Sequence, residues 1–408
     1  MSAIAEETTK ERAKPPIAIL IAASAIGPLA LNIFIPSMPG LQYSLSADYA
    51  TVQLTLTLYL IGLAVSQLLY GPLSDRYGRR PLLLGGLGLF VLASLACSFA
   101  TSIEELILAR ILQAVGGCSG IVLGRAIVRD LYERDQAASM IGYITMAWVL
   151  APMVAPLIGG ILDTWYGWQA SFYFLVVTGA LVFLACLRWL HETNFHRQSA
   201  DGLRGFVIGF PVLLRRKEFL AYALQLSFNS SVFFSFLAGA PYVMTETLGR
   251  SPVEYGIYFA LVSLGYMAGN GLSGRFSVQR GIDSMILLGL IATWAGTAIM
   301  MAFVVAGVLH PITIFVPMLL CSLGNGLSIP NGLAGAISVR PDMAGVGSGL
   351  AGFIQMFLGA MISQLVGFLQ NGAVYPLFVI MLTCATLAFL ANSFTGASKV
   401  APGTQTGP

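Results

Sequence analysis

The stretch "GPLSDRYGRRP", residues 71–81, lies between two long apolar runs at residues 54–70 and 82–100. Charged residues make up only 10% of this 408-residue chain. Four of them crowd into this one stretch: Asp75, Arg76, Arg79 and Arg80. Charged side chains are costly inside a bilayer, so the cluster predicts a tight turn at a membrane surface between two helices that enter lipid.

The composition of the whole chain is that of an integral membrane protein. Hydrophobic residues make up 57% of the sequence, and the mean hydropathy is +0.81. Soluble domains have about a quarter of their residues charged, and apart from the termini and residues 191–217 no long stretch here is that polar. A net charge of +3 without a basic aromatic patch gives no indication of nucleic-acid binding.

The cysteines give no indication of a disulfide, a metal site or a cofactor. All five lie inside apolar runs, without a CxxC pair or a cluster of His and Cys. They are Cys97, Cys118, Cys186, Cys321 and Cys384. We interpret them as small residues of the helical core, and we expect no metal and no cofactor.

Apolar runs of about 20 residues, the length that crosses a bilayer, occur twelve times. The predicted spans are residues 17–38, 50–71, 81–100, 104–126, 137–161, 168–190, 218–245, 253–274, 283–307, 311–334, 344–369 and 373–395. We therefore expect an all-α membrane protein with twelve transmembrane helices in two six-helix halves. The halves are residues 17–190 and 218–395, joined by a linker at 191–217 and flanked by tails at 1–16 and 396–408.

The basic residues predict which side of the membrane each loop faces. With the N-terminus in the cytoplasm, 19 of the 21 Lys and Arg fall on the cytoplasmic side. Only Arg250 falls on the opposite side, and Arg110 lies within a span. Because Lys and Arg are enriched in cytoplasmic loops, we expect the linker and both termini in the cytoplasm.

The two halves resemble each other in sequence. "VGGCSGIVLGRAI" from Val115 and "LGNGLSIPNGLAG" from Leu323 share glycines at 116/324 and 124/332. "GLSGRFSVQRG", residues 271–281, is a weaker copy of the charged turn at the same place in the second half. Repeated halves are common in transporters with a substrate site between them, although matched glycines can also reflect close helix packing.

These motifs resemble those of a known family. The charged turn is similar to the signature between spans two and three of major facilitator transporters. "RILQAVGG" in span four and "APMVAPLIGG" in span five resemble two motifs of the drug:proton antiporters of this superfamily. "GRAIVRDLYERD" and "LNIFIPSMPG" resemble the bicyclomycin/chloramphenicol-resistance subfamily, and the resemblance covers residues 17–395.

The resemblance implies two sets of functional residues. The gating motif comprises Gly71, Asp75, Arg76, Gly78, Arg79 and Arg80. The antiporter motif comprises Pro156, Gly159 and Gly160, with Ala151 and Ala155 where glycines are usual. We expect Asp75 to cap the first turn of the eleventh span, near residues 343–347, where the helix dipole is positive, and so to act as a gating latch. The alternative is that the arginines only anchor the topology.

The interior of the predicted spans contains a cation but no acid. Arg110 lies about six residues inside span four, with Gln113 on the same helical face. Ionisable residues inside membranes are usually functional, so we expect Arg110 to face the substrate path; the alternative is a structural Arg bonded to backbone.

All 18 acids lie in termini, loops or span ends, and this matters for proton coupling. The related antiporters place an aspartate in span one where this chain has Asn32, at the depth of Arg110. Asn does not titrate, so proton coupling here requires a peripheral acid such as Asp163, Glu246 or Asp130.

The candidate substrate cavity combines polar and aromatic residues of several spans. Gln225, Asn229 and Phe233 recur every four residues and so share one helical face. The full set is Asn32, Tyr59, Arg110, Gln113, Tyr143, Met146, Gln225, Phe228, Asn229 and Phe233. Apolar walls with a few polar groups suit amphipathic molecules, although any single aromatic or Met residue here can serve only in packing.

The function expected is secondary active export of small amphipathic compounds, such as bicyclomycin or amphenicols, by alternating access with protons as the coupling ion. The resemblance implies a multi-pass protein of the bacterial inner membrane, not an enzyme, and we expect a monomer.

The alternative is a transporter of a physiological metabolite with different or no proton coupling. An anionic metabolite is one form of this alternative, because Arg110 lacks a countercharge. An intramembrane enzyme is disfavoured because the interior of the spans contains no His and no acid, and the intact gating motif gives no reason to prefer a receptor without transport activity.

Overall fold

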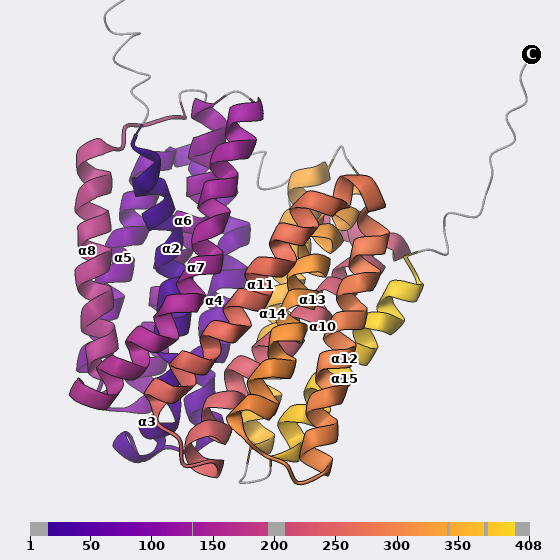
Figure 1. Cartoon of the computed structure of the whole chain (residues 1–408). Helices are drawn as coiled ribbons and strands as arrows, with labels where there is room; N and C mark the ends of the chain where they lie inside the picture. Colours follow the sequence, from indigo (N-terminus) through magenta and orange to yellow (C-terminus); the bar gives the residue numbers. More distant parts are fainter. Residues whose placement is uncertain (1–14, 133, 195–208, 341–342, 371–373, 396–408) are drawn as a thin grey trace, which may run out of the picture.

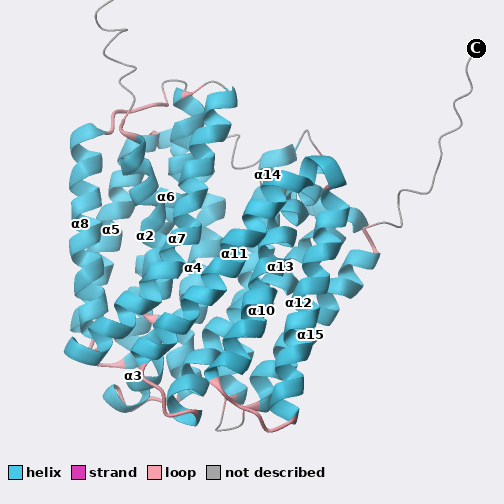
Figure 2. Cartoon of the chain, in the orientation of Figure 1, coloured by secondary structure: helices cyan, strands magenta, loops and turns pink. Residues whose placement is uncertain are grey.

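The computed structural model describes residues 15–132, 134–194, 209–340, 343–370 and 374–395. Every regular element in this part of the chain is helical (Figures 1 and 2). Twelve of the helices are long, and ten helical stretches are apolar enough to cross a bilayer. The predicted all-α membrane fold with twelve long helices is confirmed.

The helices divide into two sets of six along the chain. The first set is α2 (Ile17–Ile33), α4 (Tyr49–Tyr77), α5 (Arg79–Phe99), α6 (Ile103–Leu131), α7 (Arg134–Tyr166) and α8 (Gln169–Trp189). The second is α10 (Lys217–Tyr242), α11 (Pro252–Arg280), α12 (Ile282–Val305), α13 (Pro311–Ser338), α14 (Ala344–Leu369) and α15 (Tyr375–Ser393). Three short helices extend loops: η1 (Ile35–Ser37), α3 (Met38–Ser44) and η2 (Val243–Thr247). The predicted tails and the middle of the predicted linker lie outside the described residues.

The same packing pattern occurs in both halves. The fourth helix of each half, α6 or α13, packs against the first, second and third helices of its own half, and the third packs against the sixth. The contacts between the halves are also symmetric, because the second helix of each half packs against the fifth helix of the other: α4 against α14, and α11 against α7. A repeated arrangement of this kind places the interface of the two halves at the centre of the molecule.

The glycines shared by the two halves occupy equivalent packing positions. A Cβ on Gly116 would collide with the backbone of α5, and one on Gly324 with the backbone of α12. Likewise, Gly124 faces α2 and Gly332 faces α10. The matched glycines therefore reflect close helix packing, and this packing is itself part of the repeat.

The surface between the two ends of the helices is apolar, as a bilayer requires. Large hydrophobic side chains such as Leu92, Leu181, Leu287 and Trp294 are exposed on the outermost helices. The polar residues of the spans are instead buried, including many Ser, Thr, Asn and Gln. All five cysteines are buried and unpaired, which confirms that they are core residues.

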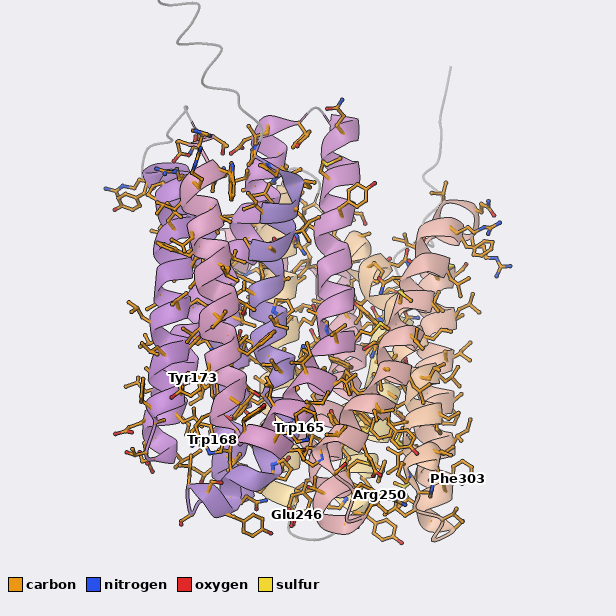
Figure 3. All side chains as sticks on the ribbon, turned by 60° about the vertical axis from the view of Figure 1, so that its left-hand side comes forward. Trp165, Trp168, Tyr173, Glu246, Arg250 and Phe303 are labelled. Carbon is orange, nitrogen blue, oxygen red and sulfur yellow. The ribbon has the colours of Figure 1, made fainter. Side chains whose placement is uncertain are left out.

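We call the end of the bundle where α2 begins and α15 ends the inner end, and the opposite end the outer end (Figure 1). Glu246, Arg250, Trp165 and Phe303 lie at the outer end (Figure 3). Five hydrogen bonds join the two halves there: Tyr43 to Glu246, Tyr49 to the Ala238 carbonyl, Gln53 to Ser363, Thr57 to Gln364, and Gln364 to the Ala50 carbonyl. The outer end is therefore closed in this conformation.

Candidate functional site

Gly78 closes the charged turn between α4 and α5. Its φ of +103° is a backbone conformation that L side chains rarely adopt. A Cβ there would also lie 2.5 Å from a carboxylate oxygen of Glu192. Gly281, with a φ of +80°, occupies the same place between α11 and α12. By contrast, a Cβ on Gly71 would meet nothing within 4 Å, so local packing does not require glycine at that position of the gating motif.

The other charges of the gating motif bind one another within the first half. The Arg79 guanidinium lies 2.7 Å from Asp75 Oδ1, and its Nε donates to Asp130 Oδ2 at 3.1 Å. The Arg76 guanidinium is exposed and lies 5.2 Å from the centre of the Tyr77 ring. Arg79 thus ties the end of α4 to the end of α6.

The expected contact between Asp75 and the first turn of α14 is not made in this conformation. α14 begins after Met343, and no side chain caps its N-terminus. Asp75 pairs with Arg79 instead. The role of Asp75 as a latch stays a prediction for the opposite conformation, in which the outer end opens.

Glu192, which the sequence analysis did not single out, organises this turn. Its carboxylate accepts hydrogen bonds from the backbone N–H groups of Arg79 (2.9 Å) and Arg80 (3.2 Å), and so caps the first turn of α5. Arg80 in turn donates to the carbonyls of Leu187 and Leu190 at the end of α8. An acid directly after the sixth span was the only signal in the sequence, because its partners lie more than 100 residues away.

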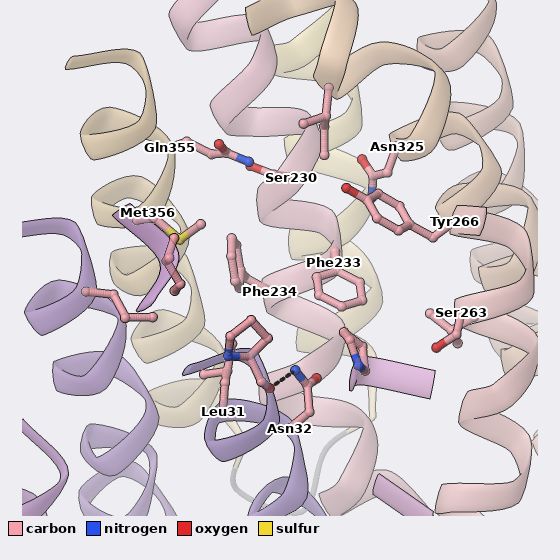
Figure 4. Close-up of a pocket in the computed structure, with 16 residues that line it drawn as sticks. Leu31, Asn32, Ser230, Phe233, Phe234, Ser263, Tyr266, Asn325, Gln355 and Met356 are labelled. Atoms are coloured by element: carbon pink, nitrogen blue, oxygen red, sulfur yellow. Dashed lines mark hydrogen bonds between the residues drawn. The ribbon is translucent and has the colours of Figure 1, made fainter. Parts of the chain in front are cut away.

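A cavity of about 140 Å³ lies between the two halves (Figure 4). The first half lines it with Pro28, Leu31, Asn32, Leu63, Ile121 and Pro152. The second half lines it with Ser230, Phe233, Phe234, Val262, Ser263, Tyr266, Asn325, Ile329, Gln355 and Met356. None of these lining side chains is charged.

Asn32 and Arg110 do not face the same cavity in this conformation. Asn32 lines the cavity, and its Nδ2 donates to the Pro28 carbonyl at 2.8 Å (Figure 4). Arg110 contacts the Ala30 carbonyl and the Phe34 ring instead. Residues 30 and 34 are one turn apart on the same face of α2, whereas residue 32 lies on the opposite face. Similar depth in the membrane therefore did not bring the two side chains together.

Arg110 is held in an aromatic cage inside the first half. Its guanidinium carbon lies 4.1 Å from the centre of the Tyr59 ring, 4.9 Å from that of Phe34 and 6.0 Å from that of Phe172. Gln113 accepts a hydrogen bond from Arg110 Nη1 at 2.6 Å. The Tyr59 hydroxyl donates to the backbone of α2, so neither Tyr59 nor Gln113 lines the cavity. Cation–π contacts of this kind stabilise a desolvated guanidinium without a carboxylate.

In the second half, Phe233 lines the cavity and Asn229 lies directly behind the lining. Asn229 Nδ2 donates to Asn325 Oδ1 at 2.7 Å. Gln225 is fully buried against α13, where the absence of a side chain at Gly332 leaves room for its amide.

Two of the remaining predicted cavity residues, Phe228 and Tyr143, are not part of the lining. Phe228 packs at the edge of an apolar cluster near the inner end of the second half. Tyr143 is 48% exposed. The side chain of Met146 lies outside the described residues. The role of all these residues in substrate binding stays a prediction.

The antiporter motif lies where three helices meet near the outer end. A Cβ on Gly159 would collide with the Ile33 carbonyl of α2, and one on Gly160 would lie 2.5 Å from the Pro252 carbonyl of α11. Pro156 also contacts α11: its carbonyl oxygen lies 2.8 Å from where a Cβ on Gly256 of α11 would be. These residues therefore let α7 pack closely against α11 of the opposite half. In the described part of the chain, no group of His, Cys, Asp and Glu is arranged to hold a metal.

Comparison with known proteins agrees with this architecture. The family model of the Major Facilitator Superfamily matches residues 20–364. The chain is 32% identical to a chloramphenicol resistance protein of Pseudomonas aeruginosa, over 88% of this chain and 85% of that protein. It is 31% identical to multidrug resistance protein D of Escherichia coli, over 85% of this chain and 87% of that protein.

The fold is also that of solved transporters. The crystal structure of a bacterial homolog of the human lysosomal transporter Spinster, inward-facing and unoccupied, matches with a TM-score of 0.71 at 15% sequence identity. The match covers 93% of this chain and 95% of that one. Together with the gating motif, the repeated halves and the central cavity, these matches show that the chain belongs to the Major Facilitator Superfamily.

Proposed function

We propose that this protein exports small amphipathic compounds, including antibiotics such as bicyclomycin or amphenicols, by alternating access between its two halves. The observation that carries this proposal is the cavity between the halves, whose lining combines apolar walls with a few uncharged polar groups. Sites for small amphipathic ligands have this composition. The names of the two relatives, a chloramphenicol resistance protein and a multidrug resistance protein, support the same function.

The symmetric contacts between the halves support alternating access. α4 packs against α14 and α7 against α11, so the interface consists of two equivalent helix pairs on which one half can rock against the other. In the conformation described, the five hydrogen bonds of the outer end are made. Export requires that they break while the inner end closes.

One form of the alternative, a carrier of an anionic metabolite, depends on Arg110 being available to bind the anion. The guanidinium lies in an aromatic cage within the first half, and the lining of the cavity contains no cation. An anion in this cavity would lose its hydration without gaining a countercharge, which is costly. Uncharged or weakly charged amphipathic substrates fit the lining better.

We propose protons as the coupling ion, with a peripheral acid such as Asp163, Glu246 or Asp130 as the group that exchanges the proton. Glu246 accepts a hydrogen bond from Tyr43 across the outer end, and Asp130 accepts one from Arg79 in the gating motif. Protonation of Glu246 would weaken a contact that joins the two halves at the outer end, and protonation of Asp130 would weaken the contact that Arg79 makes between α4 and α6 within the first half. The working unit is proposed to be a monomer in the bacterial inner membrane with both termini in the cytoplasm, because one chain supplies both walls of the cavity.

Purified protein in proteoliposomes tests export and coupling together. A chloramphenicol gradient directed out of the lumen should drive protons into the lumen, so a trapped pH dye should report acidification. A protonophore should abolish the signal, and liposomes without protein should not show it. Movement of chloramphenicol without a pH change would contradict proton coupling. If the protein moves neither chloramphenicol nor the aromatic cation ethidium, export is contradicted.

A further inference from the structure

The polar groups of the central cavity are unevenly divided between its walls. Five of the six polar lining residues belong to the second half, on α10, α11, α13 and α14. The first half contributes Asn32 and otherwise apolar side chains. An amphipathic molecule in this cavity therefore meets an apolar wall on one side and a polar wall on the other.

Three of the lining residues carry a buried polar atom without a hydrogen-bond partner among the described residues. These atoms are Asn325 Nδ2, Ser263 Oγ and Asn32 Oδ1. The residues are only 1%, 4% and 2% exposed, respectively. Leaving a buried polar group unpaired costs about 1–3 kcal/mol, so a bound molecule that pairs with these groups recovers that free energy.

The amide pair behind the wall keeps Asn325 in position and leaves hydrogen-bonding capacity unused. Asn229 Nδ2 donates to Asn325 Oδ1 at 2.7 Å and also to the Ser328 hydroxyl. Asn229 Oδ1 and Asn325 Nδ2 stay unpaired. If O and N were exchanged in both amides, Asn325 would donate and Asn229 would accept, since each amide carries both donors and an acceptor. The pair thus offers an unused donor and acceptor in either orientation.

Asn331, on the same helix, shows what an amide with a purely structural role looks like here. Its Nδ2 donates to the Ser273 hydroxyl at 2.8 Å and to the Leu327 carbonyl at 2.7 Å. It is buried and does not line the cavity. Within α13, the Asn331 amide donates to other groups of the protein. Asn325 Nδ2, at the cavity, has no partner among the described residues.

We propose that Asn325, oriented by Asn229, is the subsite that binds an uncharged amide or hydroxyl group of the substrate. The rings of Phe233 and Phe234 and the first-half wall hold the apolar part of the same molecule. This assignment rests on the proposed export function and adds the substrate class to it. Anionic ligands are disfavoured, because no lining residue offers a cation to pair with them.

Equilibrium binding to the purified protein in detergent tests the subsite with two probes. Chloramphenicol is uncharged and carries an amide and two hydroxyl groups on an aliphatic chain attached to an aromatic ring. Ethidium is an aromatic cation without such an acyl amide or hydroxyl. We expect Asn325→Leu to raise the Kd for chloramphenicol about tenfold, the loss typical of one unpaired buried group. The Kd for ethidium should change less than about twofold.

Two further variants separate recognition from folding. Asn229→Leu/Asn325→Leu replaces both partners of the amide pair, a change that can be nearly neutral for stability, and it should lose chloramphenicol binding as the single variant does. Asn331→Leu is the matched control on the same helix and should leave the ratio of the two Kd values unchanged. An equal loss of both probes in Asn325→Leu, or the same selective loss in Asn331→Leu, would overturn the subsite.

The experiment also distinguishes the subsite from the export function. If the natural protein exports ethidium from cells but does not bind chloramphenicol, the assigned substrate class is wrong and export stands. If it binds chloramphenicol through Asn325 but exports neither probe, the subsite stands and the export function is wrong.

Discussion

Asn32 is the residue of the first half whose polar group faces the central cavity. Its side chain carries an unpaired Oδ1 and lies on the face of α2 opposite to the aromatic cage of Arg110. A carboxylate at this position would therefore place a negative charge in a cavity whose lining has none. It would not be neutralised by the guanidinium on the other side of the helix.

We predict that Asn32→Asp shifts the preference of the protein towards cations. Ethidium export should rise several-fold and chloramphenicol export should fall, because a buried charge favours a partner of opposite charge. The gain should disappear as the pH is lowered and the carboxylate becomes neutral. Export assays of both probes at several pH values measure this, with Asn32→Leu as the uncharged control. Unchanged preference in a well-folded Asn32→Asp protein would contradict the position of Asn32 in the substrate path.

For Asp75, we predict that replacement by Asn lowers transport at least about tenfold while the protein still folds. Its ion pair with Arg79 leaves the Asp75 side chain 41% exposed, and such pairs contribute only about 0.2–1 kcal/mol to stability. The loss would come from the opposite conformation, in which Asp75 is expected to cap α14. Transport rate and melting temperature of Asp75→Asn, beside the exposed control Glu104→Gln, test this. Full transport activity in Asp75→Asn would reduce the cluster to a topology anchor.

At the scale of helices, the outer end is closed by glycines that let α7 and α11 approach. A Cβ on Gly256 would lie 2.6 Å from the Cα of Leu157, a contact that requires a backbone shift. Gly271, on the same helix, has nothing within 4 Å of such a Cβ. The two positions allow the same substitution to be compared with and without a steric conflict.

We predict that Gly256→Ala opens the outer end, whereas Gly271→Ala does not. Both changes gain about 1 kcal/mol of helix propensity, so the difference between them reports the packing of α7 on α11. Spin labels at Tyr173 and Tyr375, exposed positions at the outer ends of α8 and α15, should move apart only in Gly256→Ala. Identical distance distributions in the two variants would show that this glycine contact does not hold the outer end.

At the scale of the whole molecule, alternating access requires the two halves to separate at the outer end during each transport cycle. Tyr43 and Glu246 lie in different halves and share a hydrogen bond of 2.8 Å at the surface. We predict that Tyr43→Cys/Thr247→Cys, which keeps Glu246 and is joined by a short reducible bis-methanethiosulfonate, loses export and regains it on reduction. The monofunctional reagent should leave export largely intact. Undiminished export by the cross-linked protein would contradict alternating access through this end.

We also predict the orientation of the molecule in the membrane. Arg250 lies at the outer end (Figure 3), and the distribution of basic residues predicts that this end faces away from the cytoplasm. An impermeant maleimide added to intact cells should label Arg250→Cys but not a cysteine in the linker, such as Arg204→Cys. Labelling of position 250 only after the cells are permeabilised would reverse the predicted topology.

The sequence by itself determined the number of long helices, their approximate positions, the glycine turn at Gly78 and the repeat of two halves. It could do so because lipid forces each crossing segment to satisfy its own backbone hydrogen bonds as a helix, and turn geometry is equally local. Only the tertiary structure decided which face of each helix meets the cavity, so Asn32 lines it and Arg110 does not. It also brought Glu192 to the first turn of α5 and Asn229 to Asn325. The physical reason is that lipid is as apolar as the interior of the bundle, so hydrophobic periodicity does not mark the inward face, and contacts between residues about 100 positions apart leave no local pattern.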